Sequence, residues 1–217
     1  HSGPEIGVAA TKSFTSQVLI CSLIGLLLGR IRWMSSTDGT SLMEEMVSLP
    51  DKIRRVLALD ERIKSIAAKY AGVRGVMFLG RQANFPLALE GALKMKEVSY
   101  LHAEGHPSAE LKHGVIALID GHLPTVVIAP DDAVFEKNLS NIEEIKARNG
   151  PVIAIGNEGS DELARVADDV IEVPRTTPLL APLVNVVPLQ LLAYHTAVQL
   201  GCDVDKPRNL AKSVTVE

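Results

Sequence analysis

Cysteine is scarce in this chain: the only two, Cys21 and Cys202, lie far apart and neither belongs to a CxxC pair. Two such cysteines provide no disulfide framework and no zinc ribbon, and they suit a reducing compartment. We therefore expect a cytoplasmic protein, and we expect it to use no metal and no other cofactor.

An excess of positive charge is also lacking. The 217 residues include 22 Lys and Arg against 26 Asp and Glu, which gives a formal net charge of −4. Nucleic-acid-binding proteins usually carry a basic surplus, so the composition argues against a nucleic-acid partner.

No secretory signal is visible, because no basic region precedes an apolar run. The chain begins with His and not Met, which indicates a trimmed chain or a fragment. The most apolar stretch, Val18–Leu28, is interrupted by Ser22 and Gly25 and is shorter than the ~18–20 residues that a bilayer requires. We interpret it as part of a buried helix and expect no membrane association.

Apolar residues make up 47% of the chain, enough for a full globular core. Thr11 or Ser13 is placed to cap an apolar helix that runs to about Trp33, and the polar residues 35–39 should end it. Residues 41–70 have the pattern of two amphipathic helices, and Pro50 is placed to open the second.

Beyond Gly72, short apolar runs alternate with helical patterns. This alternation predicts an α/β fold, a doubly wound parallel sheet with helices on both faces. Ligands in such folds bind at the carboxyl ends of the strands, so the loops after Leu79, Ala129 and Ile155 are the expected places. The predicted strands are 75–79, 125–129, 151–155 and 170–173, and the predicted helices between and after them are 84–100, 133–149, a short one, and 182–200.

Four segments follow from this pattern. Residues 1–50 contain no strand run and look like the helical end of a preceding domain, and residues 51–72 look like a helical linker. Residues 73–200 form the α/β unit, and residues 201–217 form a polar tail.

Glu90, Lys94 and Glu97 are spaced i, i+4, i+7 and share one face of an otherwise apolar helix. Lys94 lies one turn from both carboxylates and should help to keep them ionised. The pattern alone favours an internal ladder of ion pairs over a catalytic group.

His102, His106 and His113 fall within twelve residues, together with two carboxylates and a lysine. The spacing matches no zinc motif such as HExxH, and Pro107 interrupts any helix that could bring His102 and His106 together. A loop that supplies one acid/base imidazole is the better interpretation, but the spacing does not identify which one.

The polar tail carries Leu210, Val214 and Val216 as possible apolar anchors. If the tail docks, Lys212 would be held in place and partly desolvated, which favours a neutral, nucleophilic amine.

Four stretches of the chain resemble the isomerase part of the glutamine–fructose-6-phosphate aminotransferase family, the glucosamine-6-phosphate synthases. They occur in the family's order, and the resemblance runs from the first residue to the last. The stretches are Glu5-Ile-Gly-Val-Ala-Ala-Thr-Lys-Ser-Phe-Thr, Leu89-Glu-Gly-Ala-Leu-Lys-Met-Lys-Glu, Ala109-Glu-Leu-Lys-His-Gly, and the tail from Asp203 to Glu217.

This resemblance implies an isomerase that converts fructose 6-phosphate and glutamine-derived ammonia to glucosamine 6-phosphate, through an imine and proton transfer between C1 and C2. Members of the family have a glutaminase domain followed by two sugar-isomerase (SIS) modules, and they form homodimers. The chain would contain the end of the first module, the whole second module and the tail. The glutaminase domain and a Ser/Thr-rich phosphate loop would lie upstream.

The resemblance also implies roles for individual residues. Glu97 matches the base that moves the proton, and Lys94 matches a lysine beside it. His113 matches the imidazole that opens the sugar ring and comes from the partner subunit, and Lys212 matches the lysine that engages the C2 carbonyl. Sugar-lining positions match Val8, Ala10 and Ala211, although Ala10 replaces the Ser of some members.

Two alternatives remain open. A non-catalytic phosphosugar-binding SIS module would have no need for Glu97, His113 and Lys212 together. A metal-dependent hydrolase built on the stretch from His102 to His113 would require a stoichiometric metal ion.

Overall fold

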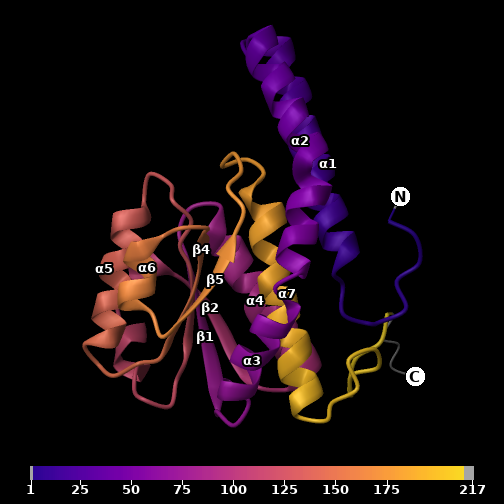
Figure 1. Ribbon diagram of the computed structural model, residues 1–217. Helices are drawn as coiled ribbons and strands as arrows, with labels where there is room; N and C mark the ends of the chain where they lie inside the picture. The colour runs from indigo at the N-terminus through magenta and orange to yellow at the C-terminus, as the bar shows by residue number, and fades with distance from the viewer. Residues whose placement is uncertain (1, 213–217) are drawn as a thin grey trace.

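A computed structural model describes residues 2–212 and contains one five-stranded sheet, all parallel, in the order β2-β1-β3-β4-β5. From β1 the chain moves outward to β2 and then crosses back over β1 to β3, so the direction of winding reverses between β1 and β3 (Figure 1). The strands are β1 (Gly75–Gly80), β2 (His102–Pro107), β3 (Thr125–Ile128), β4 (Val152–Asn157) and β5 (Asp169–Val173).

Helices cover both faces of the sheet, as predicted for a doubly wound fold. Val76 and Phe78 of β1 belong to the core beneath α3, α4 and α7, whereas Met77 and Leu79 belong to the core beneath α5 and α6 (Figure 1). The helices are α1 (Lys12–Arg32), α2 (Ser36–Leu57), α3 (Asp60–Tyr70), α4 (Asn84–Ser99), α5 (Phe135–Lys146), α6 (Asp161–Val166) and α7 (Ala181–Gln199), with two short 3₁₀ turns at Ser108–Glu110 and Val115–Leu118.

The four predicted strands are confirmed, each within two residues at either end. The sequence pattern does not predict the fifth strand, because the polar residues of His102–Pro107 are typical of a loop. They form the edge strand β2, paired in parallel with β1 from Gly75↔His102 to Gly80↔Pro107. An edge strand that pairs on one side only does not need a continuous apolar run, so the pattern used for central strands did not detect it.

The prediction that Pro50 opens a helix is wrong. Pro50 lies inside α2, which begins after Ser35, and the break before α3 comes at Ala58 and Leu59. The Ser35 hydroxyl accepts a hydrogen bond from the Asp38 N–H at 3.0 Å, so the polar residues that follow α1 also cap α2. The expected boundary at residue 50 therefore falls within one continuous helix.

The prediction that Val18–Leu28 lies in a buried helix is also wrong. Only Ser22 and Leu26 of α1 are buried, and α1 and α2 form a hairpin that projects beyond the α/β body (Figure 1). By length and composition α1 and α7 could each cross a membrane, although α7 is largely buried in the core. Core helices of soluble proteins have the same length and composition, so this test does not show whether α1 crosses a membrane. The main contacts of α1 are with α2 and α7, and they leave most of its surface exposed.

Candidate functional site

A cavity of about 330 Å³ lies between the N-terminal segment, the helix pair α4 and α7, and the start of the tail. Its chemistry is mixed, because apolar side chains alternate with Glu5, Lys12 and Lys94. The lining residues are Pro4–Gly7, Ala9, Thr11, Lys12, Lys94, Val98, Gln190, Ala193, Tyr194, Val204 and Asp205.

The two ends of the chain meet at this cavity. The N–H of Val8 donates a hydrogen bond to the Asp205 carbonyl at 3.0 Å. Gly7 lies so close to the tail that a Cβ there would be 3.1 Å from Asp205 Oδ1. Figure 1 shows the N-terminal segment and the tail side by side, next to α7. The last residues of the predicted tail, 213–217, lie outside the described residues, and with them the proposed anchors Val214 and Val216.

Glu5 holds these two ends together. Its carboxylate accepts hydrogen bonds from the N–H groups of Thr11 and Ser13 at 3.3 and 3.1 Å, and Lys212 Nζ lies 3.2 Å away. Hydrogen bonds from Ser13, and secondarily from Lys212 and Thr11, lower the pKa of Glu5 to about 2. The sequence pattern assigns no role to Glu5, because Lys212 becomes its neighbour only after folding.

Tyr100 fixes the next part of the tail. This C-cap residue of α4 has a left-handed backbone with φ of 63°, and its hydroxyl accepts a hydrogen bond from the Arg208 N–H at 2.7 Å. The Arg208 guanidinium also lies over the Tyr100 ring, 4.2 Å from its centroid. The tail is therefore docked as far as Lys212, whose amine is held by Glu5 and whose side chain is 48% exposed.

The charged face of α4 forms as its spacing predicted. Lys94 is only 4% exposed, and its Nζ lies 2.5 Å from Glu97 Oε2 and 3.6 Å from Glu90 Oε1. The structure thus brings Lys94 to the cavity wall with Glu97 directly bound to it.

Lys94 helps to keep Glu90 ionised, as expected, because its charge and hydrogen bond lower the pKa of that carboxyl, but burial outweighs this effect. Burial raises the pKa of Glu90, and the positive charge of Lys94 does not fully offset this. The negative charge of the nearby Glu97 carboxylate raises the pKa further. Two carboxylates on one face of a helix therefore experience different environments, which periodicity alone does not reveal.

Gln190 and Tyr194 line the cavity from α7, one turn apart. Among residues 2–212, the buried Nε2 of Gln190 has no hydrogen-bond partner. Sequence reasoning missed both residues, although the i, i+4 pair of polar groups within the apolar pattern of α7 was a visible signal.

The remaining candidates lie at different distances from the cavity. Val8 and Ala10 belong to the N-terminal segment that lines it, and Ala211 precedes Lys212 in the docked tail. His113 does not line it: the imidazole is 72% exposed in the turn after β2, with Nδ1 2.7 Å from Glu110 Oε2.

The edge strand brings His102, Glu104 and His106 to one face, since alternate residues of a strand point the same way. Glu104 contacts both imidazoles, at 3.2 and 3.1 Å. The argument that Pro107 keeps the two histidines apart assumed a helix and is wrong. Even so, the part of the chain that the structure describes contains no group of three His, Cys, Asp or Glu side chains suited to a metal ion.

A parallel sheet in this order, with helices on both faces, defines a doubly wound α/β protein. The SIS domain family matches residues 69–200, more than half of the chain, and the chain belongs to that family.

Individual relatives narrow this assignment. The chain is 51% identical over its whole length to glutamine–fructose-6-phosphate aminotransferase (isomerizing) from Chlorobaculum tepidum, and 54% identical to the protein of the same name from Thermus thermophilus. It covers 35% and 36% of those two proteins, so it spans about a third of the length of the curated relatives it matches.

Solved structures agree with the fold. The C-terminal domain of glucosamine-fructose-6-phosphate aminotransferase from Francisella tularensis is 37% identical, with a TM-score of 0.89 over 94% of this chain and 58% of that one. Tagatose-6-phosphate ketose/aldose isomerase from Escherichia coli shares the fold at 20% identity, with a TM-score of 0.73 over 96% of this chain and 55% of that one.

Proposed function

We propose that this chain is the isomerase part of a glucosamine-6-phosphate synthase. It would convert fructose 6-phosphate and glutamine-derived ammonia to glucosamine 6-phosphate in the cytoplasm, within a homodimer. A glutaminase domain and the first SIS module, with its phosphate-binding loop, would be supplied by the rest of a longer protein. Residues 1–50 would complete that first module, and residues 51–72 would link it to the second. No nucleic acid and no membrane take part.

The chemistry needs a base beside two adjacent sugar carbons and an amine that engages the ketone. Glu97 would carry the proton between C1 and C2, and Lys94 would hold that carboxylate in place and balance its charge. Lys212 would attack the C2 carbonyl; its nitrogen would form the C–N bond and the carbonyl oxygen would leave as water, after which ammonia would displace the lysine.

The observation that carries this proposal is the meeting of three distant segments at one cavity. Buried Lys94 and its partly exposed partner Glu97 come from α4, Glu5 comes from the N-terminal segment, and Glu5 in turn holds Lys212 of the tail at 3.2 Å. A phosphosugar-binding module without catalysis has no need for this arrangement. Val8, Ala10 and Ala211 lie on the same two chain ends and would contact the sugar.

His113 would open the sugar ring in the site of the partner subunit. This assignment is supported by its exposed position away from the cavity of its own chain, because a group 72% exposed is free to be covered by another subunit.

The test is Glu97→Gln in the complete protein, which keeps the shape and the hydrogen bond to Lys94 but removes the proton acceptor. Loss of a positioned base should lower the rate of glucosamine 6-phosphate formation by about 10²–10⁴-fold, while fructose 6-phosphate still binds. Glu136→Gln, on the exposed side of α5, is the matched control and should behave as wild type. Turnover of Glu97→Gln within a few-fold of wild type would show that Glu97 is not the base.

A further inference from the structure

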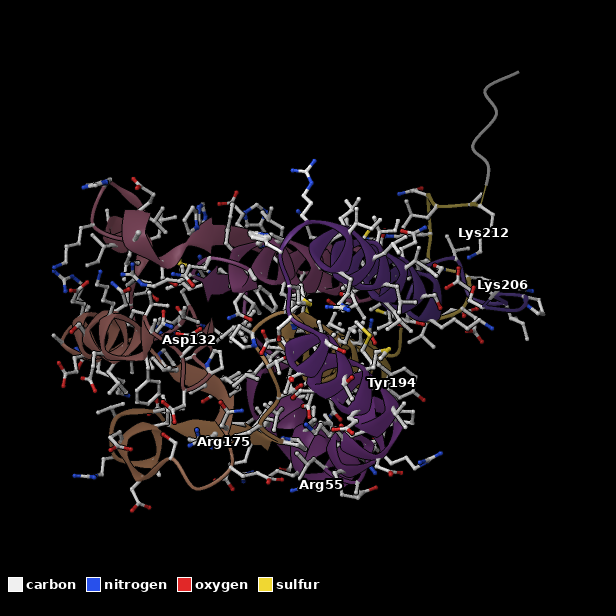
Figure 2. All side chains as sticks on the ribbon, turned by 90° about the horizontal axis from the view of Figure 1, so that it is seen from above. Arg55, Asp132, Arg175, Tyr194, Lys206 and Lys212 are labelled. Atoms are coloured by element: carbon white, nitrogen blue, oxygen red, sulfur yellow. The ribbon has the colours of Figure 1, made fainter. Side chains whose placement is uncertain are left out.

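A second cavity, of about 200 Å³, lies at the carboxyl ends of the strands. It shares no lining residue with the candidate site. Figure 2 shows Asp132, one of its lining residues, well apart from Tyr194 and Lys212. The lining residues are Gln82–Asn84 after β1, Pro130–Ala133 after β3, Asn157 at the end of β4, and Thr176, Pro178, Ala181 and Asn185 around the start of α7.

This cavity lies where the fold places ligands. The winding of the sheet reverses between β1 and β3, so the loops after these strands diverge and leave a crevice. The backbone after β1 is also strained, since Gln82 has a φ of 50°. The loops after Leu79, Ala129 and Ile155, expected from the sequence to hold a ligand, border this cavity and not the candidate site.

Two buried carboxamides form its floor. Asn84 and Asn185 are 5% and 2% exposed, and Asn185 Nδ2 donates to Asn84 Oδ1 at 3.1 Å. Asn84 is the first residue of α4, after the N-cap Ala83, and its side chain is used in this pair. This bond leaves the Asn84 Nδ2 donor and the Asn185 Oδ1 acceptor unused. No further side-chain hydrogen bond joins either amide to residues 2–212.

The rim is held rigidly by its own hydrogen bonds. Asn157 accepts from the Asp131 N–H at 2.8 Å and donates to the Val173 carbonyl at 3.4 Å. Asp131 is ion-paired with Arg175, and Asp132 accepts from the Val134 N–H at 2.9 Å. Such a rim is formed before any ligand arrives, which lowers the entropic cost of binding.

The charges at the cavity nearly cancel. The first residues of α4 and α7 line it, and each helix start carries roughly half a positive charge. The Asp132 carboxylate, which forms no ion pair with any residue of 2–212, offsets them. Among the described lining residues none is Lys, Arg or His, so nothing neutralises an added anion.

We propose that this cavity, the switch-point cavity, binds one neutral polyhydroxylated ring of monosaccharide size. Hydroxyl groups both donate and accept, and so can use the free donor of Asn84 and the free acceptor of Asn185 at once. Its volume lies below the roughly 300–1,000 Å³ of sites for drug-sized ligands, which limits the occupant to a single small ring.

The experiment uses three probes that differ in charge: glucose, glucose 6-phosphate and protonated glucosamine. Crystals of the complete protein are soaked with each probe to locate it, and affinities are measured by titration in solution. Glucose should occupy the switch-point cavity, and glucose 6-phosphate should bind there at least tenfold more weakly. Glucose absent from the cavity at 100 mM (about the highest practical soak), or a preference there for either charged probe, overturns the proposal.

Asn185→Leu removes one amide at similar volume and should weaken glucose binding at least tenfold. Asn138→Leu is the matched control: this asparagine is fully buried in α5, and neither of its amide atoms has a partner among the described residues. It should leave glucose binding unchanged, and an equal loss in both variants would contradict the proposal. If Asn185→Leu does not fold, Ala181→Leu fills the cavity from its rim and should abolish binding.

Discussion

The candidate site and the switch-point cavity differ in how they are built. The candidate site joins residues from both ends of the described chain through ion pairs, with Lys94 bound to Glu97 and Lys212 bound to Glu5. The switch-point cavity is built from loops at the strand ends and contains carboxamides and a nearly balanced charge.

The difference shows that one cavity is a consequence of the fold, whereas the other depends on segments particular to this sequence. A crevice at the point where the winding reverses comes with any doubly wound sheet. The candidate site needs two additional segments, residues 4–12 and the tail, which cover the helix pair α4 and α7. Changes to those segments should therefore affect one cavity and leave the other intact.

Removal of residues 210–217 should have the largest effect and abolish glucosamine 6-phosphate formation in the complete protein, because Lys212 is lost. The melting temperature should change little, since the sheet core and the contact of Arg208 with Tyr100 remain. Glucose binding in the switch-point cavity should also persist. A large drop in melting temperature would instead identify the tail as a structural strap.

Mixed dimers test whether His113 crosses between subunits. Glu97→Gln and His113→Ala enzymes should each be inactive, but a mixed dimer would have one site with both residues intact. Random mixing makes about half of the dimers mixed, so up to roughly a quarter of wild-type activity should return after subunit exchange. No recovery, with mixed dimers confirmed by mass, would place His113 within its own subunit or make it structural.

Glu5→Gln should weaken the junction of the two chain ends. Hydrogen bonds to charged groups contribute about 1.5–3 kcal/mol, so the loss of the carboxylate should lower kcat roughly 10–100-fold through misplacement of Lys212. Glu104→Gln, on the exposed edge strand, is a control that should leave kcat unchanged. An unchanged kcat for Glu5→Gln would show that Lys212 is positioned by other contacts.

The ionisation of Glu5 can be followed directly by the ¹³C shift of its carboxyl carbon. Its pKa is lowered to about 2, so the stabilisation from this carboxylate is fully present above its ordinary value of 4.5. It should be lost as the pH falls through about 2. A titration midpoint near 4.5 would show that the hydrogen bonds to Thr11 and Ser13 do not form in solution.

Glu90 should show the smallest effect, and with the opposite sign. Its pKa is raised, so its contribution to the free energy of unfolding is fully present below 4.5 and is lost as the pH rises through its folded-state value. Lys94→Met should raise the pKa of Glu90 further, because the one opposing charge is removed. A carboxyl titration at 4.5 in both proteins would contradict the burial of this side chain.

The α/β class, the parallel sheet and four of its strands could be predicted from the sequence, because buried parallel strands are short apolar runs whatever surrounds them. The spacing of Glu90, Lys94 and Glu97 likewise fixed their common face, since helix geometry is local. The resemblance to a family named the catalytic candidates, which composition and spacing had left open.

Only the tertiary structure decided the rest. The pairing of His102–Pro107 with β1, the exposure of α1 and the raised pKa of Glu90 depend on what lies beside each segment and not on its own pattern. The contacts of Glu5 with Lys212 and of Asn84 with Asn185 join residues 207 and 101 positions apart. Periodicity describes neighbours along a helix or strand, whereas both cavities are formed by residues that become neighbours only when the chain has folded.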